Sequence, residues 1–231
     1  MKNCYIAILI LLLPFRGFTQ HFELGFGVGT PYYLGEINPA VHFLNQPNLA
    51  FTAMIKRNLN KRYALRLSGA YGKIVANDLN NGLGFSSFRN LQLNSNLLDV
   101  STILEFNFFP YEIGHPLSAK ASPYVFIGVS GFYNRAELST NSDNGFQTQQ
   151  NTLSAAVPFG VGLKIKLLSN LGMQLEWGMR KTFTDNFDAL ENINYSLINL
   201  SNKGNYDWYN FTLLTLNYKI LTKLDRCPVV K

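Results

Sequence analysis

The stretch Ala155–Phe183, AAVPFGVGLKIKLLSNLGMQLEWGMRKTF, decides the fold class of this chain. On both sides of Ser169–Asn170, large apolar residues occupy every second position, and the positions between them are mostly small or polar. This period of two is typical of β-strands with two different faces. A two-residue polar connection is typical of a tight hairpin. The stretch therefore predicts two antiparallel strands, Ala155–Leu168 and Leu171–Phe183.

Six further segments alternate in the same way, although the faces of the last one are mixed and stay unassigned. Most of the eight segments are longer than the ~5–6 residues of an ordinary strand and match the ~9–11 tilted residues that cross a bilayer. One face is large and apolar, whereas the other carries small residues and scattered charges, as the lumen of a narrow barrel requires. The six segments are Phe22–Tyr33, Leu49–Arg57, Tyr63–Lys73, Leu97–Phe109, Pro123–Tyr133 and Trp208–Ile220.

Short and long connections alternate along the chain, which is typical of outer-membrane barrels with short periplasmic turns and long external loops. The long gaps hold most of the asparagines, so we interpret them as solvated loops. The sequence therefore predicts an all-β fold, an eight-stranded antiparallel transmembrane β-barrel with four long external loops, in the cell outer membrane. The short gaps are Asn58–Arg62, Pro110–Ser122 and Ser169–Asn170, and the long gaps are Leu34–Asn48, Ile74–Asn96, Asn134–Ser154 and Thr184–Asp207.

Composition and the N-terminus agree with this prediction. The chain has 231 residues, 47% of them hydrophobic and 15% charged, with a net charge of +6. No basic run exceeds two residues, which disfavours nucleic-acid binding. Met1–Gln20 has a positive start, an apolar core and small residues at its end, and this pattern predicts a secretory signal peptide. The expected organisation is a signal peptide at 1–20, the barrel at 21–220 and a periplasmic tail at 221–231.

The lumen-facing positions of the predicted strands carry several charges. An eight-stranded barrel is filled by its own side chains, and a buried charge without a partner is too costly to persist. We therefore expect these side chains to form a structural ion-pair network. A gated proton or solute path is the less favoured alternative. The candidates for the network are Arg66, Glu105, Lys164, Glu176 and Arg180, with Asp99 on the same face.

Catalytic and metal signals are weak. No histidine lies on a predicted strand beside a serine and an acid, as acyl-transfer chemistry would need. A lipid-modifying site would have to combine His42 with Ser86 or Ser87 on another loop. Carboxylates around the fourth long gap, Asp185, Asp188 and Asp207, leave calcium binding open, although solvated turns explain them as well. We expect no enzyme activity, no cofactor and no metal.

Three stretches, Phe22–Pro39 (FELGFGVGTPYYLGEINP), Glu176–Asp188 (EWGMRKTFTDNFD) and Lys203–Phe211 (KGNYDWYNF), carry a family resemblance, together with Arg226–Pro228. With their spacing, they resemble the PorG-like family of Bacteroidetes outer-membrane β-barrel proteins over nearly the whole mature chain. The motif residues that carry the resemblance are Arg180, Lys181, Asp185, Asp207 and Trp208.

The resemblance implies a non-enzymatic barrel that acts as a tether or assembly component of the type IX secretion system, docked on the periplasmic ring of the PorK lipoprotein and PorN and embedded in outer-membrane lipid. Pro110–Ser122 is the preferred contact, although an ordinary loop stiffened by proline explains it equally well. The alternative function is a small surface barrel whose long loops bind an external ligand or cell surface. The residues expected to bind the periplasmic partner are Tyr111, Glu112, His115, Lys120 and Cys227.

Overall fold

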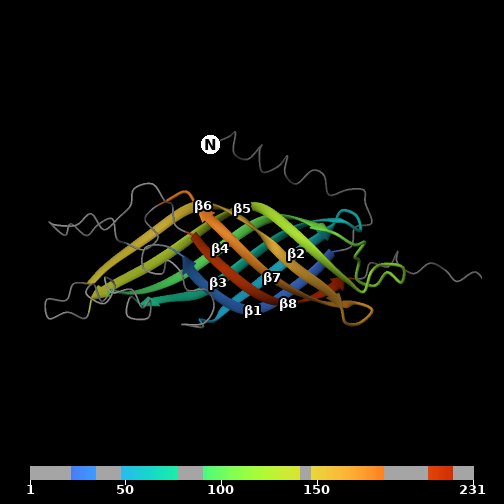
Figure 1. Cartoon of the computed structure of the whole chain (residues 1–231), viewed down its shortest axis with the longest axis horizontal. Helices are drawn as coiled ribbons and strands as arrows, with labels where there is room; N and C mark the ends of the chain where they lie inside the picture. Colours follow the sequence, from blue (N-terminus) through green and yellow to red (C-terminus); the bar gives the residue numbers. More distant parts are fainter. Residues whose placement is uncertain (1–21, 35–47, 78–90, 141–146, 185–207, 221–231) are drawn as a thin grey trace, which may run out of the picture.

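The computed structural model contains eight β-strands (Figure 1) and describes residues 22–34, 48–77, 91–140, 147–184 and 208–220. Among these residues, no helix is long and apolar enough to cross a membrane. The strands are β1 (Phe22–Leu34), β2 (Ala50–Asn58), β3 (Tyr63–Asn77), β4 (Leu91–Asn107), β5 (Ala121–Thr140), β6 (Gln147–Lys166), β7 (Leu171–Thr182) and β8 (Trp208–Ile220).

The strands form a closed antiparallel barrel in which each strand pairs with its neighbours in sequence and β1 pairs with β8. Closure runs along the whole of β1, from Phe22 opposite Ile220 to Leu34 opposite Trp208. This architecture confirms the predicted fold class. Because the barrel is closed, the parts of the strands that pair with a neighbour on both sides have no free edge. Their backbone hydrogen bonds are made inside the sheet.

The exposure pattern is the reverse of that in a water-soluble protein. Phe26 is 67% exposed and Val129 is 66% exposed on the outer face, whereas Glu105 and Gln174 are 0% exposed inside. Successive residues of a strand point to opposite faces, so every strand contributes to both surfaces. An apolar outer wall around a polar, side-chain-filled interior is the arrangement of a barrel that spans a membrane.

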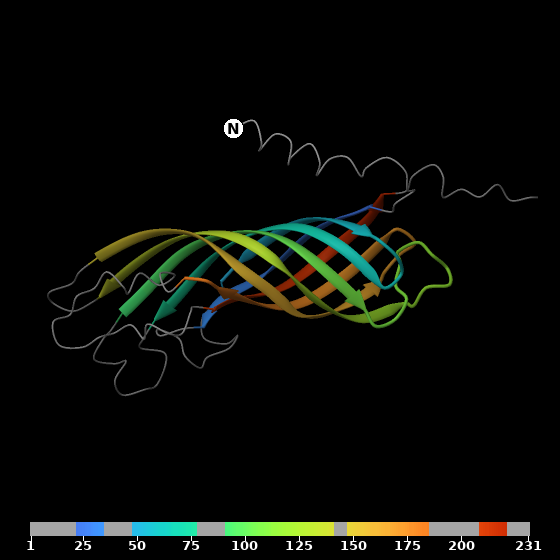
Figure 2. The same ribbon diagram turned by 90° about the horizontal axis from the view of Figure 1, so that it is seen from above.

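The two ends of the barrel differ (Figure 2). The β2–β3, β4–β5 and β6–β7 connections lie at one end, which we call the turn end. At the other end, the loop end, the strands stop at different heights. β5 and β6 have 20 residues each, whereas β2 has 9 and β7 has 12. The wall of the barrel is therefore taller on the β3–β6 side.

This taller wall corrects two predicted loops. The gaps Ile74–Asn96 and Asn134–Ser154 were expected to be solvated throughout, yet β3 continues to Asn77, β4 starts at Leu91, and β5 and β6 extend to Thr140 and from Gln147. These strand ends pair with one another in continuous register. The added ends of β5 and β6 are mostly polar in sequence, so they lack the apolar alternation that marks the rest of these two strands.

The faces of β8, unassigned from the sequence, are settled by its partners. Tyr209, Phe211 and Leu213 are 0–3% exposed and point into the barrel. Leu214 and Leu216 are 44% and 50% exposed on the outer face. Large apolar residues therefore fill the lumen at the loop end of β8, which explains the mixed sequence pattern.

Candidate functional site

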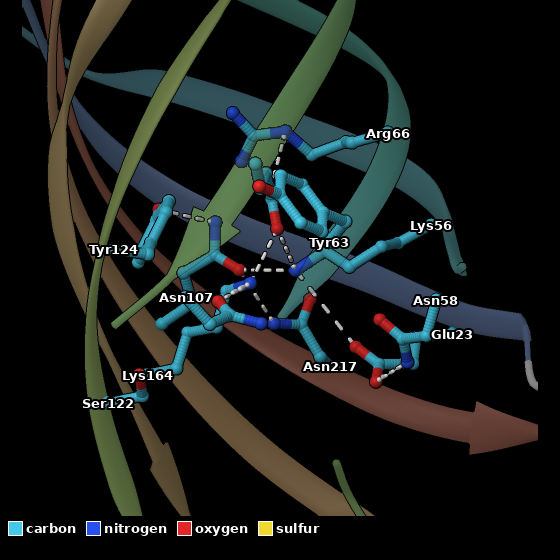
Figure 3. Close-up of polar contacts among 12 residues, drawn as sticks. Glu23, Lys56, Asn58, Tyr63, Arg66, Asn107, Ser122, Tyr124, Lys164 and Asn217 are labelled. Carbon is cyan, nitrogen blue, oxygen red and sulfur yellow. Dashed lines mark hydrogen bonds and ion pairs between the residues drawn. The ribbon is translucent and has the colours of Figure 1, made fainter. Parts of the chain in front are cut away.

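The interior near the turn end holds a polar network centred on Glu105 of β4. Its carboxylate lies 2.6 Å from Lys164 Nζ, 3.2 Å from Lys56 Nζ and 3.2 Å from Arg66 Nε. The three cations come from β6, β2 and β3 and converge in the lumen (Figure 3). All four side chains are 2% exposed or less. One carboxylate thus joins strands from opposite sides of the barrel.

A second carboxylate, Glu176 of β7, extends the network across the lumen. Arg66 Nη1 donates to Glu176 Oε2 at 2.5 Å, and the Tyr124 hydroxyl donates to the same oxygen at 2.7 Å. Gln174 Nε2 donates to the Tyr124 hydroxyl at 2.7 Å, and Gln174 Oε1 accepts from Lys56 Nζ at 2.5 Å. The carboxylates are therefore linked by neutral side chains as well as by cations. Such connection of buried polar groups rigidifies a core.

A separate charged cluster lies nearer the loop end. Arg180 Nε is 3.6 Å from Asp99 Oδ2, and the Tyr209 hydroxyl donates to the same carboxylate oxygen at 2.7 Å. The Arg180 guanidinium also lies 4.5 Å from the centre of the Phe211 ring, within the range of a cation–π contact. This cluster joins β4, β7 and β8.

The charges of the interior balance. Buried charged side chains among the described residues are five cations and four carboxylates. Glu112, which pairs with Lys219 at the turn end, supplies a fifth carboxylate. Because these charges balance and side chains fill the lumen, the interior does not select cations or anions. The lumen of an ion-conducting barrel would select one of them. The cations are Lys56, Arg66, Lys164, Arg180 and Lys219, and the other carboxylates are Glu23, Asp99, Glu105 and Glu176.

The long β4–β5 connection folds back into the barrel mouth at the turn end. We call residues 110–120 the lid. Tyr111 is 5% exposed and Ile113 is 0% exposed. A Cβ atom built on Gly172 would lie 2.7 Å from the Tyr111 hydroxyl and 2.8 Å from Ile113 Cδ1, so both side chains pack directly against β7. The lid therefore closes the mouth with apolar and aromatic side chains.

Polar contacts fasten the lid to three parts of the barrel. Glu112 Oε1 lies 3.1 Å from Lys219 Nζ of β8. Lys166 Nζ of β6 donates to the carbonyl oxygens of His115 at 2.9 Å and Ser118 at 3.1 Å. The Tyr111 amide donates to the Lys61 carbonyl at 2.9 Å in the β2–β3 turn. These contacts fix the lid in one position.

The lid has two further local features. Gly114 adopts a φ of 81°, a left-handed conformation that glycine accepts without the Cβ clash of other residues. Burial raises the pKa of the Tyr111 phenol, and the carboxylates of Glu23 and Glu105 raise it further. The phenol therefore stays protonated and neutral in the closed mouth.

The structure brings together four of the five side chains predicted for the lumen network, because Arg66, Glu105, Lys164 and Glu176 are in contact. Arg180 is also inside but belongs to the Asp99 cluster. The predicted network omitted Lys56 and Glu23, whose side chains lie 3.9 Å apart, and the prediction did not include Lys219, which pairs with Glu112 of the lid. Residues two positions apart in a strand share a face, so Lys56 lies on the same face as Thr52 and Met54. This alternation could have identified Lys56 as a lumen residue.

The residues expected to bind a periplasmic partner are placed unequally. Tyr111 is turned into the mouth and is 5% exposed, and Glu112 pairs with Lys219. Lys120 is exposed and His115 is half-buried, and the lid also exposes Pro116 and Leu117, the latter at 86%. Cys227 lies outside the described residues.

The family-motif residues lie on both faces of the β7–β8 pair. Arg180 points inward, whereas Lys181 points outward, with its Nζ 5.2 Å from the centre of the Trp208 ring. The remaining motif residues, Asp185 and Asp207, are outside the described residues, as are the loop candidates for catalysis and calcium binding, His42, Ser86, Ser87 and Asp188. Within the described part of the chain, no three His, Cys, Asp or Glu side chains form a metal-binding group.

Comparisons with known proteins agree with the barrel. A family model described as a domain of unknown function, DUF6089, matches residues 2–228. No curated protein matches the sequence. Similar solved structures include the attachment invasion locus protein Ail of Yersinia pestis (TM-score 0.50, 11% identity, covering 88% of this chain and 100% of that chain) and a major outer membrane protein of Thermus thermophilus (TM-score 0.49, 13% identity, 88% and 100%). The likeness to Ail concerns the fold alone, which is that of an outer-membrane barrel.

Proposed function

The chain belongs to the DUF6089 family, and we propose that it is a non-enzymatic outer-membrane barrel that tethers or assembles part of the type IX protein secretion machinery. Its partner in this proposal is a periplasmic ring built from proteins like PorK and PorN. The resemblance of the motifs around Arg180 and Trp208 to PorG-like barrels motivates the choice of machinery. The turn end faces the periplasm, because short turns do so in bacterial barrels.

The filled lumen supports an anchoring role. The interior is crossed by ion pairs and closed at the turn end by Tyr111 and Ile113. Small eight-stranded barrels are packed with side chains rather than hollow. A barrel of this kind is a rigid body in the membrane, and its natural contribution to an assembly is to hold attached parts in place.

The fixed lid is the observation that carries the proposal. It is held by β2–β3, β6 and β8 and still presents Leu117 with 86% of its surface exposed, beside exposed Pro116. An apolar side chain displayed on a pre-ordered loop can serve as an anchor in a partner's pocket, because little conformational entropy is lost when it binds. Exposed Lys120 lies on the same connection and adds a charge to this surface.

The experiment is a pull-down of the tagged full-length barrel from native membranes in mild detergent, followed by mass spectrometry. We expect the periplasmic ring proteins to be recovered with the parent chain and lost with Leu117→Asp combined with Lys120→Glu. The matched control is Leu153→Asp, at a leucine that is 81% exposed near the loop end. Gel migration of unheated samples checks that every variant is folded.

Three outcomes would contradict the proposal. Recovery of the parent barrel without ring proteins would remove the secretion role. Recovery of the ring with the Leu117→Asp, Lys120→Glu variant at parent levels would show that the lid is not the contact. Loss of the ring with the Leu153→Asp control as well would place the contact elsewhere on the barrel.

A second candidate function rests on the tall wall at the loop end. β5 and β6 extend beyond β7 by several residues, and their ends are rich in Asn, Gln, Thr and Ser. A polar wall raised above the membrane suits a surface barrel that binds an external ligand. Replacing residues 135–152 by a short hairpin would abolish such binding to cells or matrix while leaving ring recovery unchanged, so the two functions are separable.

A further inference from the structure

The outer face of β7, β8 and β1 near the loop end carries a polar site inside an otherwise apolar wall. The strand register places the residues of this site at three successive outward-facing positions along β8, each with its partners on β7 and β1. Lys181 pairs with Trp208 nearest the loop end, and Asn210 lies between Met179 and Tyr32 one step further in. Thr212 lies at the next level between Trp177 and Thr30. Since Tyr209 and Phe211 point inward, Asn210 and Thr212 point outward toward lipid.

Asn210 is fully buried on this face and lacks hydrogen-bond partners. Its exposure is 0%, and neither Oδ1 nor Nδ2 has a partner among the described residues. The neighbouring Thr212 Oγ1 is buried and, within the described part of the chain, unpartnered in the same way. A buried amide without partners costs free energy, and polar side chains at lipid-facing depth are otherwise avoided. The site therefore holds two donor groups, the Asn210 amide nitrogen and the Thr212 hydroxyl, and two acceptors, Asn210 Oδ1 and the same hydroxyl oxygen.

Aromatic side chains enclose these polar groups. Trp177 Nε1 donates to the Tyr32 hydroxyl at 2.8 Å, a bond that passes from β7 to β1 over β8. Trp208 packs against Phe159 with ring centres 6.0 Å apart. Lys181 Nζ lies over Trp208 at 5.2 Å and is exposed. Tyrosine and tryptophan collect at the membrane interface, so the site lies where headgroups meet acyl chains.

We propose that this surface binds one outer-leaflet lipid, an anionic, phosphate-bearing glycolipid with amide-linked acyl chains, the class to which lipid A belongs. Lys181 holds the phosphate, and Asn210 with Thr212 holds the acyl linkages below it. The aromatic side chains line the flanks, and Tyr32 moves aside when the lipid enters. This inference does not depend on the proposed secretion role.

The depth of the polar groups fits such a lipid. Asn210 is two residues from the level of Lys181, which is about 7 Å along the strand and about 5 Å along the membrane normal for a strand tilted by roughly 40°. A lipid's acyl linkages lie below its phosphate by a separation of this order. A cation above an amide and a hydroxyl therefore matches the order of groups in an anionic lipid.

The chemistry of Asn210 selects the amide linkage. Nδ2 needs an acceptor, which any acyl carbonyl provides, but Oδ1 needs a donor. An ester-linked phospholipid has no donor at its acyl linkages, whereas an amide-linked chain has an N–H. Binding an ester lipid would leave Oδ1 buried and unpaired, with the cost that this carries. We therefore expect discrimination between the two classes.

The test uses the full-length barrel in nanodiscs that contain equal amounts of monophosphoryl lipid A and phosphatidylglycerol. The barrel is then extracted in mild detergent, and the retained lipid is identified by mass spectrometry. We expect retention of lipid A in preference to phosphatidylglycerol. Asn210→Val and Lys181→Gln should each lower lipid A retention by about fivefold, the effect of one hydrogen bond or charge contact.

Matched controls lie on the opposite side of the barrel. Thr102→Val removes an exposed, outward-facing polar group from β4, and Lys73→Gln removes an exposed, outward-facing cation from β3. Neither should change retention. Tyr32→Phe keeps the ring but removes the hydroxyl that joins Trp177, and it should leave retention equal or higher because the enclosure opens more easily.

Three results would overturn the proposal. Equal retention of the two lipids would remove the selection by Asn210. Equal losses in the controls would reduce the effect to general contact with lipid. Unchanged lipid A retention in folded Asn210→Val, with higher thermal stability, would show that the amide is only a sealed polar group.

Discussion

Lys219 Nζ lies 3.1 Å from Glu112 Oε1, an ion pair between two residues 107 positions apart that joins the last strand to the lid. β8 also closes the barrel against β1. The strand that completes the barrel is therefore the strand that holds the lid in its mouth. Closure of the sheet and closure of the mouth at the turn end are coupled through Lys219.

Glu112→Gln should loosen the lid without unfolding the barrel. Both side chains of the pair are largely buried, and loss of one partner of such a pair costs about 3 kcal/mol locally. Hydrogen exchange at residues 111–119 should become faster, whereas exchange in β4 and β5 should not change. Glu137→Gln, which breaks an exposed pair with Arg135, is the control. Unchanged exchange at the lid would mean that the contacts of Lys166, Lys61 and the packed Tyr111 and Ile113 hold it without the ion pair.

Glu105→Gln should be the most destabilising single change in the lumen. It leaves Lys56, Arg66 and Lys164 without their shared carboxylate, and removal of one partner from a buried ionic group costs about 3–5 kcal/mol. Urea unfolding of the barrel in lipid vesicles measures the loss. Adding Lys164→Met should recover part of the stability because it removes one uncompensated cation. If the single variant is as stable as the parent, the network does not stabilise the fold.

Gly172→Ala should displace the lid from the mouth. The added methyl group would lie 2.7 Å from the Tyr111 hydroxyl and 2.8 Å from Ile113, closer than Cβ contacts allow. Limited proteolysis of the folded barrel should then cut at Lys120. Gly69→Ala is the matched control, because a Cβ there meets nothing within 4 Å. Resistance of both variants to the protease would show that the lid adapts to the extra methyl group.

Replacing Asp99 and Arg180 together by leucine and methionine should leave stability nearly unchanged. Buried ion pairs exchanged for apolar residues of similar volume are often neutral, and Phe211 already lies against the guanidinium. Asp99→Leu alone should cost about 3–5 kcal/mol, since it leaves Arg180 buried without its carboxylate. Vesicle unfolding of the two single variants and the double variant forms the cycle that tests this. Additive losses would contradict the prediction.

The sequence predicts the membrane-facing wall well, because that wall depends on local alternation alone. Leu24, Phe26 and Val28 show it in β1, and the outward residues of β2 to β7 follow the same rule. The members of the lumen network are less predictable. Parity says that Lys56 points inward, but only the closed barrel places it near Glu105, on a strand that is not its neighbour.

Other features depend on tertiary structure and escape sequence reasoning. The ends of β5 and β6 are mostly polar in sequence. They therefore resemble loops, because strand residues beyond the bilayer need no alternation of apolar and polar side chains. The lid is a proline-containing segment that resembles an ordinary turn. Its packing depends on Gly172 and Lys219, which are distant in the chain. In β8, the large apolar side chain of Phe211 points inward. The sequence of β8 therefore does not show the usual alternation of large apolar outward residues with small or polar inward residues.

The convergence of Lys164, Lys56 and Arg66 on Glu105 has a consequence for assembly. Because the side chains of a strand alternate, a pairing error of one residue in β2, β3 or β6 would turn its cation from the lumen to the lipid-facing side. The cost of such a cation rises from about 0–1 kcal/mol near the interface to about 2–4 kcal/mol at the bilayer midplane. Only one alignment of these strands therefore places all three cations beside the carboxylate on β4. During assembly, the ion pairs of Glu105 therefore stabilise a barrel closed with the correct strand register over one in which a strand has slipped.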